Sequence, residues 1–299
     1  VLDPQQPVPL SPSRLETIQR SPLDWYVATA RAEEASDAAR SVGTLVHSIA
    51  EQSPEGTGDQ LAAQIHRRWR ELGLPETWES DLLKERAETM LRRFAQYVIQ
   101  ARKDEHRRLA LVEGGFQVLI HGRARDALLR GRVDRLEIDD QGRFVVVDLK
   151  TGRSAPATKD LPEHPQLLAY QAALAAGAGH AMVEEQQRGI RQSTDAEGQK
   201  PEPSEPLVLR EGPLQHLPGG ALLVQLGVDR VNVSTQLQDG LTEEGGVQVR
   251  ELVSAAADLV AGDRFLASHT AGSNTGHGGI GCSLPEICPL CAEGRQVTE

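Results

Sequence analysis

Long apolar segments are missing from this 299-residue chain. No apolar run approaches the roughly 20 residues that a membrane-spanning helix needs, and no charged and then apolar leader opens the sequence. These absences exclude a membrane-spanning class and predict a cytoplasmic location. With 39% hydrophobic and 25% charged residues, the composition is typical of a globular protein rather than a disordered one.

Two common catalytic motifs are also absent. The sequence has no Gly-x4-Gly-Lys-Ser/Thr loop, so it carries no nucleotide-driven motor of its own. It has no Gly-x-Ser-x-Gly motif, which leaves a serine hydrolase unsupported. The glycine-rich run 276–281 follows no predicted strand and opens no predicted helix. We therefore interpret this run as a connector rather than a phosphate-binding loop.

Cysteine is scarce, and its three copies lie together near the end of the chain. Cys282, Cys288 and Cys291 are too few and too close to form a disulfide framework. With His269 or His277 they would make a Cys3His set, which is an ordinary ligand set for structural Zn²⁺. The alternative is three reduced thiols in a loop.

Charge is unevenly distributed along the chain. The net charge of −11 argues mildly against a nucleic-acid partner. However, the acidic excess lies in residues 151–299, whereas arginine clusters occur in the first half, at 67–70, 92–108 and 123–135. Such clusters can follow a phosphate backbone locally, although solvated helix faces would show the same pattern.

Periodicity divides the chain into three parts. Ser11 as N-cap and Pro12 at the first helical position open a helical region. We expect a helical N-terminal lobe over 1–110, a core over 111–267 and a glycine-rich tail with the cysteines over 268–299. The lobe should be broken near 54–58 and 73–75. Within the core we expect strands at 116–120, 131–138, 144–150 and 221–226, helices around 166–171 and 247–261, and a mobile polar insertion near 186–218.

A predicted hairpin brings three chemical groups to one face. Asp139-Asp-Gln-Gly is a tight-turn sequence, and if Ile138 pairs with Phe144, Asp134 lies opposite Asp148. Cross-strand partners share a face, with Cβ atoms about 4.5–5.5 Å apart. Lys150, two residues beyond Asp148, returns to that face. A register slip of one residue would break this arrangement.

Two close carboxylates repel each other unless a cation compensates. Their oxygen ligands suit Mg²⁺ or Mn²⁺, and such an ion can hold a phosphate oxygen and activate water. Lys150 would then orient or help to deprotonate that water and offset developing negative charge. The alternative is a surface salt-bridge cluster.

The ordered motifs resemble those of RecB-like nucleases of the PD-(D/E)XK superfamily. They are Gly131-Arg-Val-Asp134-Arg, Val147-Asp148-Leu-Lys150-Thr-Gly and Gln166-x-x-x-Tyr170, preceded by Gly43-x-x-x-His47 and by Ser21-Pro-Leu-Asp-Trp25. The resemblance implies that His47, Asp134 and Asp148 are metal ligands, that Lys150 is catalytic, and that Gln166 and Tyr170 line the site. It implies an α/β restriction-endonuclease-like fold, with a central mixed sheet flanked by helices and a helical N-terminal lobe.

The resemblance also implies a biological setting. The end of the chain most resembles the nuclease domain of an actinobacterial Adn/Add-type helicase–nuclease subunit, so we take the chain to be a piece of a longer protein. The expected activity is DNA hydrolysis, on single strands produced during double-strand-break end resection. The expected partners are DNA, a helicase motor domain in the parent chain and a second helicase–nuclease subunit. A catalytically silent, DNA-binding nuclease-like module is the alternative.

The cysteines depart from the family pattern. Many relatives hold an iron–sulfur cluster with one cysteine near the domain start and three at its end, spaced Cys-x2-Cys-x5-Cys. Here Ser21 stands at the first position, and the later spacing is reversed. Because a cubane cluster held in the family manner needs four thiolates, we expect no four-cysteine iron–sulfur cluster.

Overall fold

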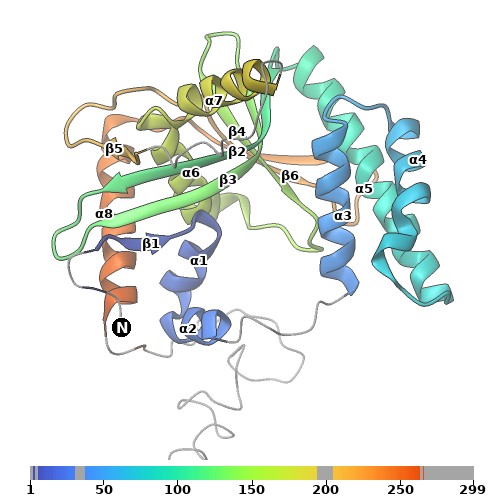
Figure 1. The fold of residues 1–299 in the computed structure, drawn as a ribbon, viewed down its shortest axis with the longest axis horizontal. Helices are drawn as coiled ribbons and strands as arrows, with labels where there is room; N and C mark the ends of the chain where they lie inside the picture. Colours follow the sequence, from blue (N-terminus) through green and yellow to red (C-terminus); the bar gives the residue numbers. More distant parts are fainter. Residues whose placement is uncertain (1–2, 4–5, 31–37, 194–204, 263–264, 266–299) are drawn as a thin grey trace, which may run out of the picture.

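A single mixed sheet forms the centre of the protein (Figure 1). The computed structural model describes residues 3, 6–30, 38–193, 205–262 and 265. The strands run in the order β5-β2-β3-β4-β6-β7, with β1 also pairing with β3. Their bounds are β1 Val8–Leu10, β2 Arg108–Ile120, β3 Ala127–Ile138, β4 Phe144–Lys150, β5 Leu207–Leu209, β6 Gly220–Gln225 and β7 Ser234–Gln238.

Helices cover both faces of the sheet and create two apolar cores. Val146 of β4 and Leu223 of β6 belong to a core shared with α1, α6, α7 and α8. Val147 and Leu149 of β4 belong to the other core, which is shared with α3, α4 and α5. The helices are α1 Pro12–Arg20, α2 Pro22–Ala30, α3 Ala38–Gln52, α4 Gly58–Arg68, α5 Trp78–Lys103, α6 Pro165–Ala175, α7 Ala178–Ser193 and α8 Glu243–Ala261, with 3-10 helices η1 Trp69–Leu72 and η2 Thr158–Glu163. The predicted mixed sheet flanked by helices is therefore confirmed.

The predicted β3–β4 hairpin has the expected register. Ile138 pairs with Phe144, and the antiparallel ladder continues as far as Arg135 with Val147. The turn is closed by the Asp139 carboxylate, whose Oδ1 accepts the backbone N–H groups of Gln141 and Arg143. Gly142 takes the left-handed conformation, with φ 77°, that a residue with a Cβ seldom adopts.

One edge of β3 is shared between two strands. Residues 127–129 of β3 pair with β1 in parallel, whereas residues 135–138 pair with β4. Residues 130–134 of β3 therefore have no strand partner on this edge in the described part of the chain. This gap exposes a short piece of backbone in the middle of the sheet, and the candidate site is built around it.

Several elements differ from the sequence expectations. The polar segment 186–218 is not a single mobile insertion, because α7 continues to Ser193 and β5 pairs with β2 in parallel. Strand β2 begins at Arg108 rather than at Phe116, since the Gly114-Gly115 pair hides its continuity in the sequence. The short strands β1 and β7 were not predicted. The cysteines and the glycine-rich tail lie outside the described residues, and within these no helix is both long and apolar enough to cross a membrane.

Candidate active site

The carboxylate of Asp134 lies where β3 and β4 separate. Beyond Arg135 and Val147 the register would bring Asp134 beside Asp148 and then Val133 beside Leu149, but the backbone ladder stops. The N–H of Leu149 donates instead to Asp134 Oδ2, at 2.7 Å. The side chain thus replaces a backbone acceptor and lets the strands part without leaving this N–H unpaired.

The carboxylate of Asp148 is buried next to Lys150. Asp148 Oδ2 lies 2.7 Å from Lys150 Nζ, while Oδ1 accepts hydrogen bonds from Gln166 Nε2 at 2.8 Å and from the Tyr170 hydroxyl at 3.2 Å. Burial raises the pKa of Asp148, the ammonium group of Lys150 opposes that rise, and the charge of Asp134 adds to it. Asp148 and Lys150 therefore form a compact ion pair against α6, whereas Asp134 accepts from the backbone of Leu149 and faces His47.

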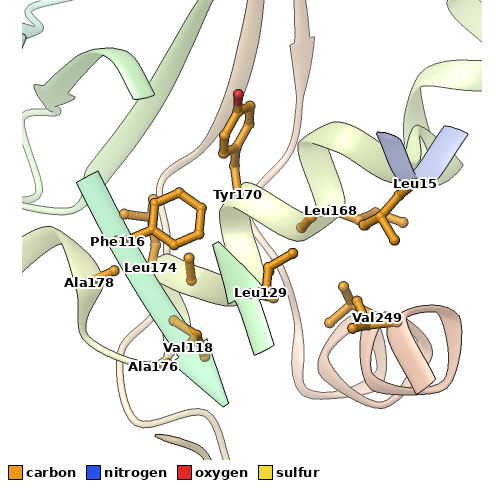
Figure 2. Packing of buried hydrophobic residues seen from close by; sticks show 14 of the residues in the cluster. Leu15, Phe116, Val118, Leu129, Leu168, Tyr170, Leu174, Ala176, Ala178 and Val249 are labelled. Atoms are coloured by element: carbon orange, nitrogen blue, oxygen red, sulfur yellow. The ribbon is translucent and has the colours of Figure 1, made fainter. Parts of the chain in front are cut away.

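Helix α6 supplies the residues that hold this cluster in place. Gln166 and Tyr170 are four residues apart, so they share a helix face, and Gln166 accepts a hydrogen bond from Lys150 Nζ at 2.7 Å. The ring of Tyr170 packs in the apolar core, edge-on to Phe116, while its hydroxyl points away from the labelled apolar side chains (Figure 2). Burial raises the pKa of Tyr170 far above its usual value, so the phenol remains a proton donor.

Helix α3 brings His47 to Asp134 because Gly43 allows a close approach. A Cβ on Gly43 would lie 2.9 Å from Thr151 Oγ1, so a side chain at this position would push α3 away from the end of β4. One helical turn later, His47 Nδ1 lies 3.4 Å from Asp134 Oδ1. Burial lowers the pKa of His47, but the carboxylates of Asp134, Asp148 and Glu113 outweigh burial and raise it.

Glu113 is a further acidic residue that the sequence reasoning did not identify. The β2–β3 register pairs Val112 with Arg135 and Gly114 with Val133, which places Glu113 opposite Asp134. Its φ of 53° is unusual for a residue with a side chain. Burial first, and then the charge of Asp134, raises the pKa of Glu113. The strand pairing of β2 with β3 would have revealed it, but no short turn marks that pairing in the sequence.

The donor set fits a hard divalent cation, although the side chains are not arranged around one. Asp148 Oδ2 is buried, lies 2.7 Å from the ammonium group of Lys150 and is close enough to Asp134 to feel its negative charge. His47, Glu113 and Asp134 line a small cavity of about 10 Å³, close to the space of one water molecule. Within the described residues, however, no three His, Cys, Asp or Glu side chains converge as metal ligands. Carboxylate oxygens suit Mg²⁺ or Mn²⁺, and a metal bound here would require Asp134 to exchange its contact with His47 for the ion.

Of the six residues predicted for the active site, Asp148, Lys150, Gln166 and Tyr170 contact one another, and His47 contacts Asp134, whose charge acts on Asp148. Cys282, Cys288 and Cys291 lie outside the described residues, so their role as structural ligands remains a prediction. Ser21 is buried, and its hydroxyl accepts the backbone N–H of Asp24 at 3.2 Å. This serine therefore caps the start of α2.

Comparison with known proteins gives one informative match. The family model of the PD-(D/E)XK nuclease superfamily matches residues 9–289. A crystal structure of SSO0001 aligns with 82% of this chain and 85% of its own, at 13% identity and a TM-score of 0.27, which is too low to carry an argument. No curated protein matches the chain. None of these comparisons supports the narrower Adn/Add-type resemblance.

Proposed function

The chain belongs to the PD-(D/E)XK nuclease superfamily, and we propose that it is a metal-dependent deoxyribonuclease that hydrolyses phosphodiester bonds of single-stranded DNA. The observation that carries this proposal is the meeting of Asp134, Asp148 and Lys150 at the point where β3 and β4 separate. A surface salt-bridge cluster does not explain this placement, because Asp148 is only 5% exposed. Two carboxylates and a lysine held together in a sheet are costly unless they bind something.

The residues divide into ligands and positioning groups. Asp134, Asp148 and His47 would hold Mg²⁺ or Mn²⁺, the ions that members of the superfamily typically use. When bound, such an ion supplies a Lewis acid for a phosphate oxygen and lowers the pKa of its water. Lys150 would orient the attacking water and offset the negative charge that develops on the phosphate.

Gln166 and Tyr170 orient the side chains of Lys150 and Asp148. Gln166 accepts from Lys150 and donates to both Asp148 and Tyr170, so its amide sets the separation of the ammonium group from the carboxylate. The Tyr170 hydroxyl also lies 3.4 Å from the carbonyl oxygen of Arg132, on the unpaired edge of β3. These contacts hold Lys150 toward the space where the strands part.

We further propose that DNA reaches this site from a helicase motor, in double-strand-break end resection. The support is the RecB-like order of the motifs, together with the absence of a nucleotide-binding loop in this chain. A motor domain in the same parent chain and a second helicase–nuclease subunit are the partners that this resemblance implies.

A nuclease assay tests the enzymatic proposal directly. The wild-type protein should shorten end-labelled single-stranded DNA with Mg²⁺ or Mn²⁺ and leave it intact with EDTA. Asp148→Asn should abolish cleavage in a chain that still folds, because the amide keeps the shape of the side chain but removes the charge that would hold the metal. Asp140→Asn, at an exposed turn position, is the matched control and should cleave normally. Tight DNA binding without cleavage under either metal would instead identify a catalytically silent module.

A further inference from the structure

A cluster of cations lies directly beyond Lys150. Arg86 of α5 donates from Nη2 to the carbonyl oxygens of Thr151 and Gly227, at 3.2 and 3.3 Å. Arg153 lies two residues beyond Thr151 and is exposed. Burial lowers the pKa of Arg86, the nearby positive charges of Arg153 and Arg93 lower it further, and the negative charge of Asp229 opposes them. Three guanidinium groups and one carboxylate therefore lie near the end of β4.

An exposed apolar stripe continues from this cluster along α5. Trp78, Leu82 and Arg86 are spaced by four residues and so follow one face of the helix. Trp78 is 73% exposed and Leu82 is 57% exposed. A tryptophan is rarely left so open without a partner, because its ring is one of the largest apolar surfaces a side chain can bury. Helices α3 and α5 lie side by side next to the sheet (Figure 1). Trp78 and Leu82 lie on the first two turns of α5, on the N-terminal side of Arg86.

The other approach to the site offers no excess of positive charge. A cleft of about 710 Å³ lies between β2 and α7 and reaches Glu113, which is paired with Arg132 at 3.3 Å. Its other charged lining residues are Glu184, Glu185 and Glu205 against Arg130 and Arg188. The charged side chains that line the cleft therefore sum to one net negative charge, which does not attract a phosphate backbone.

We propose that a single DNA strand reaches Lys150 along α5, with its phosphates on Arg153 and Arg86 and a base stacked on Trp78. Arginine forks match phosphate oxygens in shape and charge, and Arg86 uses only Nη2 for the two carbonyl contacts. Aromatic side chains bind the bases of single strands by stacking, without regard to sequence. The proposal rests on the deoxyribonuclease function and adds to it the path by which the strand approaches the site.

Binding to a fluorescein-labelled single-stranded oligonucleotide in EDTA tests this path without cleavage. Trp78→Ala should raise Kd by about 5- to 150-fold, the range for loss of one stacked base, while Trp78→Phe should retain most of the affinity. Arg153→Gln should raise Kd and reduce the slope of log K against log salt concentration by about 0.7, as expected for one lost phosphate contact on a single strand. Both side chains are exposed, so these variants should have the melting temperature of the wild type.

Arg188→Gln is the matched control, since Arg188 is an exposed arginine on α7 at the cleft between β2 and α7. It should bind DNA as the wild type does. Wild-type affinity and salt slope in Trp78→Ala and Arg153→Gln would overturn the proposed path, as would a larger loss in Arg188→Gln than in Arg153→Gln. Failure of the proposed function has a different signature: the wild type would bind DNA through Trp78 and Arg153 yet cleave nothing with either metal.

Discussion

Glu137 should be among the costliest side chains in the protein to neutralise. It is fully buried, and its carboxylate accepts hydrogen bonds from Arg135 Nε at 2.6 Å, Arg107 Nε at 2.9 Å and the Tyr97 hydroxyl at 2.8 Å. Both arginines are buried as well. Burial, followed by the charge of Glu137, raises the pKa of Tyr97 well above its usual value, so the phenol remains a donor.

Glu137→Gln keeps the shape of the side chain but leaves the buried guanidinium group of Arg135 without its carboxylate and leaves Arg107 with Glu105 alone. Removing one partner of a buried ion pair costs about 3–5 kcal/mol, a large part of the 5–15 kcal/mol that is typical of a whole domain. The substitution should also disturb the active site. Arg135 Nη1 donates to the carbonyl oxygen of Pro54 at 2.7 Å, and this contact ties the strand of Asp134 to the loop between α3 and α4.

Urea unfolding followed by circular dichroism measures this effect as a change in the midpoint at constant m value. Glu105→Gln is the control, because Glu105 also pairs with Arg107 but its side chain is 31% exposed. The control should lose at most about 1 kcal/mol, as is usual for partly exposed pairs. A loss below about 1 kcal/mol in Glu137→Gln would refute the reasoning, since the two arginines would then not depend on its charge.

Three further predictions concern α3, α6 and the cysteines. Gly43→Val should push α3 away from Thr151 and so move His47. Mn²⁺ binding measured by calorimetry should weaken, and the cleavage rate should fall by about 100-fold. Adding Thr151→Ala to this variant should restore part of both the metal binding and the cleavage rate. Burial lowers the pKa of His164, so its protonation in the unfolded chain should reduce stability as pH falls through about 6.5. His164→Gln should therefore flatten the pH dependence of the melting temperature between 7 and 5, and an unchanged slope would contradict this. Metal analysis of anaerobically purified protein should show at most one zinc ion and no cubane cluster, whereas about four iron and four sulfide per chain would contradict the cysteine prediction.

The parts of the site that sequence predicts are those that depend on local spacing. The turn at Asp139–Gly142 sets the hairpin register, so Asp134, Asp148 and Lys150 follow from counting residues across it. Gln166 and Tyr170 follow from helical spacing together with the motif resemblance. The length of β2 and the strand β5 depend on pairing between distant segments, which the sequence does not encode in any short pattern.

Counting residues across the turn could not predict that β3 and β4 separate at the site. The same arithmetic that places Asp134 opposite Asp148 predicts a continuous ladder, yet the ladder ends one pair earlier. The cause lies elsewhere in the chain, because β1 occupies the other part of the same β3 edge and Tyr170 reaches the backbone between them. Asp134 can therefore face His47 while Asp148 faces α6.

The charge of the whole chain is a poor guide to where DNA can bind. A phosphate at Arg153 responds to charges within about one Debye length, roughly 8–10 Å at physiological salt, and not to the net charge of −11. Arg86 donates to the carbonyl oxygens of Thr151 and Gly227, which are 65 and 141 residues away in the sequence. Its position beside Arg153 therefore arises only on folding. The arginines at the end of β4 attract a polyanion, whereas the α7 cleft, with one net negative charge among its lining side chains, does not. This local difference favours the proposed approach along α5.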